Sequence, residues 1–108
     1  MISGYRLMWL MVMFDLPVTE AEQRKASTAF RNGLLDLGFE MAQFSVYVRF
    51  CAGQSRLRTY QNRVRELLPE GGKVKMIAFT DKQYGEIVSF EGSERSASAR
   101  PPPQLALF

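Results

Sequence analysis

The sequence predicts a small α+β protein in which two helices pack on one face of a mainly antiparallel sheet. Three observations support this prediction: a short apolar run, two segments with helical periodicity, and further segments that alternate as strands do. The chain has 108 residues, so one domain is expected. Hydrophobic residues make up 46% and charged residues 23%, which argues against a largely disordered chain.

The first strand is expected at residues 7–14, a continuous apolar run. The run is too short to cross a bilayer. Asp15-Leu16-Pro17 follows it where a signal peptide would have small residues. A short apolar run that ends in a polar turn is typical of a central strand buried on both faces. No membrane partner is therefore expected.

The first helix is expected after Thr19-Glu20-Ala21-Glu22, which has the form of a capping box with Thr19 as the N-cap. Small and apolar residues then share one arc at about 100° per residue, which predicts packing against the sheet. They are Ala26, Ala29, Phe30, Gly33, Leu34 and Leu37. Gly38 is expected to end the helix.

Residues 39–50 are expected to form the second β region. From Phe44 to Phe50, apolar residues alternate with Ser45, Tyr47 and Arg49, the pattern of a half-buried strand. Because the region is long for one strand, residues 39–43 could form a separate strand of a hairpin, and the sequence leaves this open. The three polar residues would share a face that either meets a partner or covers one side of the sheet.

A second helix is expected to open at Gly53-Gln54-Ser55 and to end at Pro69. Residues 73–80 follow as a strand, 81–85 as a turn and 86–90 as a shorter strand. This order predicts a ferredoxin-like βαββαβ sandwich over residues 1–92, with an additional C-terminal strand. Residues 93–103, rich in proline and serine, are expected to be a linker, and residues 104–108 are apolar again.

Composition excludes several classes of chemistry. Histidine is absent and Cys51 is the only cysteine. The absence of histidine excludes Ser-His-Asp and Cys-His nucleophilic sites and imidazole zinc sites. A single cysteine excludes an internal disulfide and a cysteine-rich metal cluster. Nothing in the cysteine count suggests an oxidising compartment, so a cytoplasmic location is expected.

Several segments between residues 7 and 92 resemble one known family. The first is Met11-Val12-Met13-Phe14-Asp15-Leu16-Pro17, followed by a helix that carries arginine and lysine. Further along come Leu37-Gly38-Phe39, Gln43-Phe44-Ser45-Val46-Tyr47-Val48-Arg49, Gly71-Gly72-Lys73-Val74 and Met76-Ile77-Ala78-Phe79-Thr80. Together they resemble the CRISPR-associated endoribonuclease family, the small adaptation proteins that partner the CRISPR integrase.

The resemblance implies a symmetric homodimer that binds double-stranded DNA with the CRISPR integrase during spacer acquisition. It also implies that Asp15 is the candidate catalytic and metal-binding residue, because the family's metal-associated acid falls there and some members are described as metal-dependent nucleases acting on RNA or DNA. Mg²⁺ is then the expected cofactor.

One aspartate makes a poor magnesium site, since Mg²⁺ prefers one or two carboxylates together with waters and phosphate oxygens. A two-fold axis could place two copies of Asp15 face to face. Without histidine, a general base would be a carboxylate, a hydroxyl or a metal hydroxide. The structural alternative for Asp15 is a turn residue whose side chain bonds backbone N–H groups before Pro17.

The charge pattern suggests contacts to phosphate. The net charge is +3, and ten of the 14 cationic residues are arginine, which binds phosphate bidentately. Seven cations on the two expected helices are candidates for contacts to a nucleic-acid backbone, the alternative being an ordinary solvated face. They are Arg24, Lys25, Arg31, Arg56, Arg58, Arg63 and Arg65.

The apolar C-terminus is a candidate partner-binding segment. Leu105, Leu107 and Phe108 would dock as an edge strand on the second subunit or on the integrase. Plain disorder is the alternative for this segment.

Three functions remain open from the sequence. The first is the DNA-binding adaptation subunit described above. The second is a Mg²⁺-dependent endoribonuclease that cleaves single-stranded RNA without the integrase, either within the same family or of the VapD toxin type. The third is a ferredoxin-like regulatory or assembly domain without a nucleic-acid role.

Overall fold

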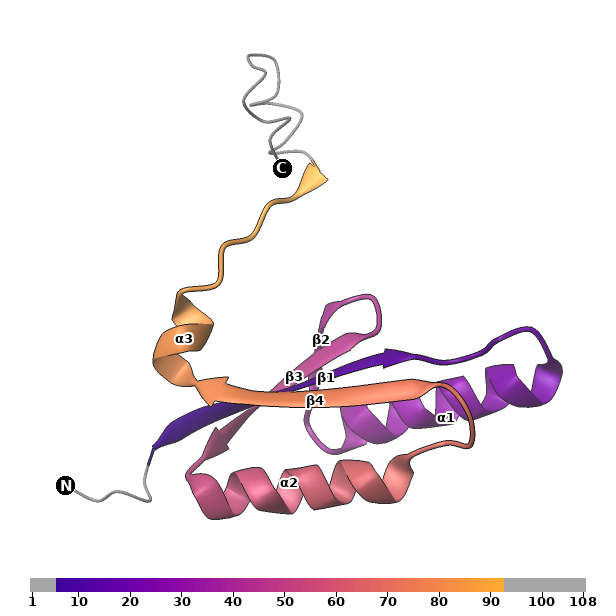
Figure 1. Cartoon of the computed structure of the whole chain (residues 1–108), viewed down its shortest axis with the longest axis horizontal. Helices are drawn as coiled ribbons and strands as arrows, with labels where there is room; N and C mark the ends of the chain where they lie inside the picture. Colours follow the sequence, from indigo (N-terminus) through magenta and orange to yellow (C-terminus); the bar gives the residue numbers. More distant parts are fainter. Residues whose placement is uncertain (1–5, 93–108) are drawn as a thin grey trace.

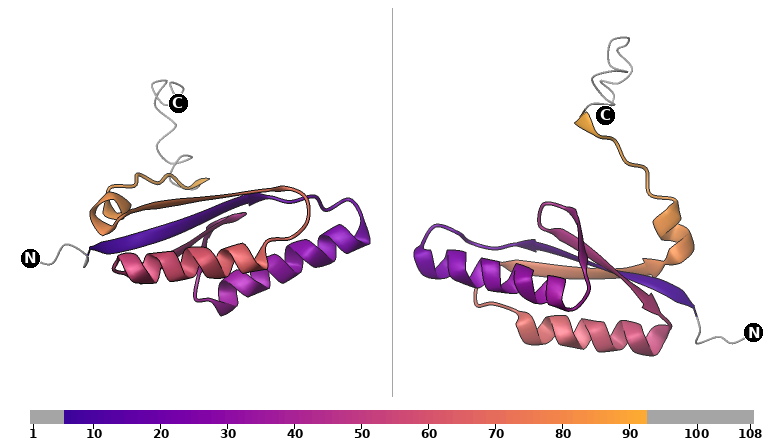
Figure 2. Two further views of the ribbon diagram at one scale, coloured as in Figure 1. Left: turned by 60° about the horizontal axis from the view of Figure 1, so that its bottom comes forward. Right: turned by 180° about the vertical axis from the view of Figure 1, so that it is seen from behind.

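The computed structural model describes residues 6–92, which form four strands and three helices (Figure 1). In chain order they are β1 (Leu7–Asp15), α1 (Ala21–Asp36), β2 (Glu40–Gln43), β3 (Val46–Ala52), α2 (Gln54–Leu67), β4 (Lys73–Thr80) and α3 (Asp81–Gly85). The strands form one antiparallel sheet in the order β2-β3-β1-β4. Helices α1 and α2 cover the same face of this sheet (Figure 2). The predicted α+β, ferredoxin-like arrangement is confirmed.

Strand β1 is central in the sheet, as its apolar run predicts. Its residues alternate between the two faces, and Leu10 and Val12 have no exposed surface on the helix side. On the other side, Trp9, Met11 and Met13 are only partly buried. The expectation of a strand buried on both faces is therefore wrong for this chain, because the helices cover one face and leave the other open. We call this second side the open face.

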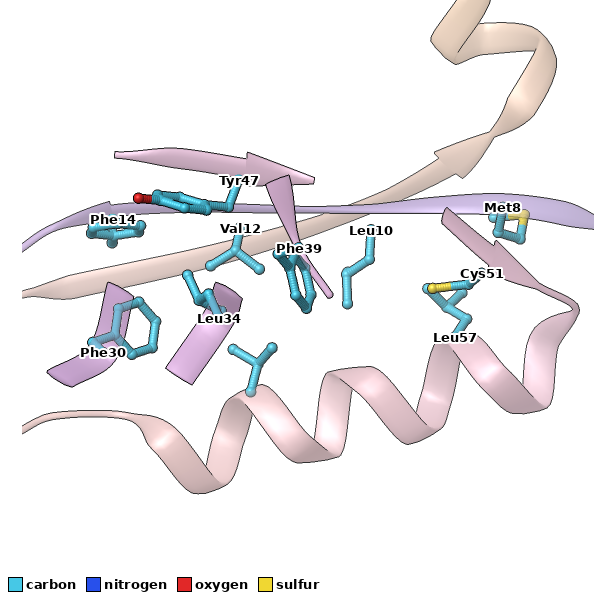
Figure 3. Close-up of a cluster of buried hydrophobic side chains, with 11 residues drawn as sticks. Met8, Leu10, Val12, Phe14, Phe30, Leu34, Phe39, Tyr47, Cys51 and Leu57 are labelled. Atoms are coloured by element: carbon cyan, nitrogen blue, oxygen red, sulfur yellow. The ribbon is translucent and has the colours of Figure 1, made fainter. Parts of the chain in front are cut away.

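The hydrophobic core lies between the sheet and the two long helices. Figure 3 shows Leu10 and Val12 of β1 pointing from the sheet toward the helices, and Met8 and Phe14 belong to the same buried cluster. Helix α1 contributes Phe30 and Leu34, both almost fully buried. Burial of this apolar surface is the main favourable contribution to folding.

Helix α1 begins one residue later than predicted. Its N-cap is Glu20, whose backbone N–H donates to the side chain of Gln23 at 2.9 Å, so Thr19 is not the cap. Along the helix, Ala29 is exposed whereas Ser27 is buried. The predicted end is confirmed, because Gly38 adopts a φ of 91°, in the left-handed region that glycine tolerates.

Residues 39–52 contain a hairpin, one of the two possibilities that the sequence left open. Strands β2 and β3 are joined through Phe44 and Ser45, and Ser45 has a φ of 66°. Tyr47 of β3 is buried in the core, whereas Phe44 is 83% exposed. In the predicted alternation from Phe44 to Phe50, the apolar residues are thus not the ones that face the helices.

Arg49 explains this reversal, since it lies on the core side of β3. Its guanidinium donates to the carbonyl of Leu37 at 2.9 Å, the carbonyl of Phe50 at 2.6 Å and the hydroxyl of Tyr60 at 2.8 Å. It also lies 4.0 Å from the centre of the Tyr60 ring. A charged group can be partly buried when its donors are satisfied in this way.

Helix α2 and strand β4 confirm their predictions. Leu57 and Val64 of α2 are buried in the core, and the helix ends before Pro69. Tyr60 and Leu67 pack against the same cluster, although Leu68 is 44% exposed.

The segment after β4 differs from its prediction. Residues 81–85 form the short helix α3, whose N-cap Thr80 accepts a hydrogen bond from the N–H of Gln83 at 3.1 Å. Residues 86–90 are not a strand in the described chain, so the additional C-terminal strand is not present there. The physical reason is the position of the segment: after α3 the chain leads away from the sheet (Figure 1), and residues 86–92 are all exposed. A strand needs a strand beside it to complete its hydrogen bonds.

The predicted linker at 93–103 and the apolar segment at 104–108 lie outside the described residues. Within the described part, residues 6–92, no helix is long and apolar enough to span a bilayer.

Candidate functional site

Asp15 is the last residue of β1 and is exposed. The alternation along β1 places it on the open face, in line with Met11 and Met13. In the register of the sheet it lies directly opposite Lys73 of β4. Met13, Phe14, Asp15, Lys73 and Lys75 line a shallow pocket of about 250 Å³.

A turn of two glycines holds β4 against the end of β1. Gly71 and Gly72 have φ values of 83° and 77°, a backbone conformation that residues other than glycine rarely adopt. A Cβ atom on Gly72 would lie 2.8 Å from the carbonyl oxygen of Asp15 and 2.7 Å from a methyl group of Leu16. The close approach therefore requires glycine, and it places Lys73 opposite Asp15.

The carboxylate of Asp15 makes no hydrogen bond or ion pair with any residue in the described range, 6–92. The alternative that the side chain caps the turn before Pro17 thus receives no support. Among these residues there is also no cluster of three or more Cys, Asp or Glu side chains that could hold a metal ion. One chain accordingly supplies a single free carboxylate, which does not complete a magnesium site.

The seven predicted phosphate-contacting cations all lie on α1 and α2, the helices that cover one face of the sheet (Figure 2), whereas the alternation of β1 places Asp15 on the other face. Arg24 is held by the carbonyls of Val18 at 3.2 Å and Thr19 at 2.9 Å. Arg65 donates to Asn62 at 2.7 Å. The structure therefore gathers the cations on one side but does not bring them to Asp15.

Helix α2 is the more basic of the two helices, with four arginines and one glutamate. Arg56 and Arg63 are seven residues apart, as are Arg58 and Arg65, so each pair shares a side of the helix. All four arginines are exposed.

The open face is the feature that the sequence prediction missed. Trp9, Met11 and Met13 were expected to be core residues, yet they lie on this face, partly exposed. Most of their direct partners on neighbouring strands are also apolar, namely Phe50, Val48 and Val46 on β3 and Phe79 and Ile77 on β4, whereas Met13 lies opposite Lys75 on β4. Ile77 is 50% exposed and Phe50 36%. The sequence held a signal for this face: both helices were expected on one side of the sheet, and an apolar strand in such a sheet must expose alternate residues on the other side.

Helix α3 packs on the open face near the start of β1. The indole N–H of Trp9 donates to Asp81 at 2.7 Å, and the Trp9 ring stacks on Tyr84 with centroids 3.9 Å apart. Phe50 contacts Trp9 edge to face at 5.5 Å. These contacts hold α3 against the sheet.

The single cysteine is a core residue. Cys51 is 1% exposed, and burial raises the pKa of its thiol, an effect that the charge of Arg49 partly opposes. A buried thiol that resists ionisation is a poor nucleophile.

Comparison with known proteins shows the family. Residues 8–87 match the family described as CRISPR associated protein Cas2. The chain belongs to the Cas2 family. The resemblance seen in the sequence is therefore confirmed.

Several relatives of this Cas2-family chain are similar over all or nearly all of their length. A protein of Paracidovorax avenae is 54% identical over 108 residues, covering 100% of both chains. A protein of Flavobacterium psychrophilum is 42% identical over 107 residues, covering 99% of this chain and 93% of its own. One from Parvibaculum lavamentivorans is 40% identical over 101 residues, covering 94% and 100%. All three relatives are named CRISPR-associated endoribonuclease Cas2.

Proposed function

We propose that this chain serves CRISPR adaptation as a homodimer that holds double-stranded DNA for the CRISPR integrase. Family membership supports the biological context. The observation that carries the proposal is the division of the molecule into two unlike sides. One side of the sheet is apolar and open, and the other carries helices rich in arginine.

A second copy is the partner that fits the open face. Beyond the part that α3 covers at Trp9, the face is a mostly apolar surface that includes Met11, Met13 and Ile77, and monomeric proteins rarely leave such a contiguous patch uncovered. Two-fold pairing matches one apolar surface with its own copy. The helices of both copies then face outward.

The outward helices support binding to a DNA backbone. In a dimer the exposed arginines of α2 are present twice, on surfaces related by symmetry. Contacts from arginine to phosphate position a duplex without reading its bases. Little sequence preference is therefore expected.

The proposal is tested by light scattering and by fluorescence anisotropy with a duplex of about 30–40 base pairs at increasing salt. We expect a dimer whose affinity falls steeply with salt, by a logarithmic slope of about 0.9 for each phosphate contact. Replacing Arg56 and Arg63 by alanine should reduce this slope, and the matched pair Arg58 and Arg65 tests the other side of α2. A strictly monomeric chain, or salt-insensitive binding, contradicts the proposal. A chain that binds no duplex at low salt favours the assembly-domain alternative.

A second candidate function is a Mg²⁺-dependent endoribonuclease that acts without the integrase. The names of the relatives and the exposed carboxylate of Asp15 on the open face favour it. Pairing of two open faces would bring two copies of Asp15 to the same interface. Asp15 of both copies would then hold the ion, and bound Mg²⁺ supplies polarisation of a phosphodiester. One chain alone does not offer this ligand set among its described residues.

A further inference from the structure

Two lysines lie beside Asp15 and outside the arginine-rich helices. Lys73 and Lys75 alternate along β4 with Val74 and Met76, which pack toward the core. Both lysines are exposed. Lys73 is the direct cross-strand partner of Asp15, and Lys75 is the partner of Met13. All three charged side chains therefore share the open face.

These residues change the character of one end of the open face. Along β1 and β4 the face is apolar from Trp9 to Met13, and it becomes charged at Asp15, Lys73 and Lys75. The two ammonium groups outnumber the one carboxylate, so this end carries a positive surplus. A polar rim beside an apolar centre stays accessible to a ligand when the centre of an interface is covered.

The charge balance indicates which ligand this end would bind. A lysine ammonium is a compact cation with three donors that binds phosphate as a point charge. A lone carboxylate beside two lysines is a weak ligand for a free divalent cation, because the lysines repel that cation. They attract a phosphate group and offset its repulsion by Asp15.

We propose that Lys73 and Lys75 bind the phosphodiester backbone of a nucleic acid and hold it next to Asp15. The inference rests on the proposed nucleic-acid function, and it adds a contact surface on the side of the sheet opposite the helices. The turn before Lys73 consists of Gly71 and Gly72, so no side chain of the turn obstructs a backbone that approaches Lys73 and Asp15. The site is formed by two adjacent strands, so its three charged groups have a fixed register.

The test uses the full chain and fluorescence anisotropy of a labelled duplex, and of a labelled single-stranded RNA, without Mg²⁺ at several salt concentrations. The variants are Lys73→Ala/Lys75→Ala, Lys73→Arg/Lys75→Arg, and the control Lys82→Ala on α3. For at least one of the two probes, the alanine variant should lose logarithmic salt slope for each contact removed, by about 0.9 with the duplex or about 0.7 with the single strand. The arginine variant should keep the wild-type slope, since it keeps both charges. Lys82→Ala should match the wild type.

The outcomes separate this inference from the function on which it rests. If the wild type binds neither probe at low salt, the nucleic-acid function fails, and this site with it. If the wild type binds but the alanine variant keeps the full slope for both probes, only the role of Lys73 and Lys75 is overturned. Light scattering and circular dichroism accompany each variant, and a loss of binding that merely follows loss of the dimer also overturns it. Inorganic phosphate should compete no better than chloride at equal ionic strength. Stronger competition would mean a site for free phosphate in place of the backbone.

Discussion

Asp15 shows how one residue depends on its neighbours for a function. Its carboxylate is exposed and has no partner among residues 6–92, so its removal should leave the fold intact. Lys73 and the turn at Gly71 and Gly72 belong to other segments of the chain, and they determine the charge and the space beside the Asp15 carboxylate. A role in metal binding requires a second carboxylate, which symmetry can provide from the same sequence position.

For this single residue, we predict that Asp15→Ala abolishes any Mg²⁺-dependent nuclease activity. Stability should change by no more than about 0.5 kcal/mol, as is usual for exposed residues. Cleavage of labelled RNA and duplex DNA with Mg²⁺ measures activity, and thermal unfolding measures stability. Glu22→Ala is the matched control, because Glu22 is an exposed acid in the first turn of α1. Equal cleavage by the wild type and Asp15→Ala would remove the catalytic role.

Among the secondary-structure elements, α3 shows how tertiary contacts stabilise a segment that could not persist alone. It has five residues, and isolated helices of that length are not stable in water. Trp9 supplies both the hydrogen bond to Asp81 and the stacking on Tyr84 that hold it. The position of α3 therefore depends on a side chain of β1.

We predict that Tyr84→Ala releases α3 from the sheet. Trp9 is the only tryptophan, so its fluorescence reports this contact directly. Its emission should shift to longer wavelength, its quenching by acrylamide should increase, and the chain should lose about 1 kcal/mol of stability. Lys82→Ala, also on α3, is the control and should leave the emission unchanged. An unaltered Trp9 spectrum in Tyr84→Ala would contradict this role for α3.

In the whole molecule, pairing with a second copy and binding to DNA are proposed for opposite sides of the sheet. The open face supports pairing with a second copy, and the helices present cations outward. Within residues 6–92, the buried cluster is formed by β1, α1, β3 and α2, together with Phe39.

We predict that a chain ending at Gly92 keeps its fold but loses affinity for the second copy or for the CRISPR integrase. A chain ending at Pro103 removes only residues 104–108 and tests Leu105, Leu107 and Phe108 specifically. Thermal unfolding checks the fold, light scattering the dimer, and calorimetry with purified integrase the complex. If both shortened chains assemble like the full chain, docking of the tail is rejected.

The types of most elements followed from local patterns in the sequence. Apolar spacing and glycine positions located β1, the end of α1, the helix α2 and the strand β4, because periodicity and capping act over a few residues. The resemblance likewise identified the family from short motifs.

The tertiary structure decided which face of each strand is covered. Alternation shows that a strand has two faces, but the choice between them depends on partners far away in the sequence. Arg49 faces the core only because Leu37 and Tyr60 satisfy its guanidinium there. Lys73 meets Asp15 only through the register of β1 and β4, and the open face exists only because both long helices pack on the same side of the sheet.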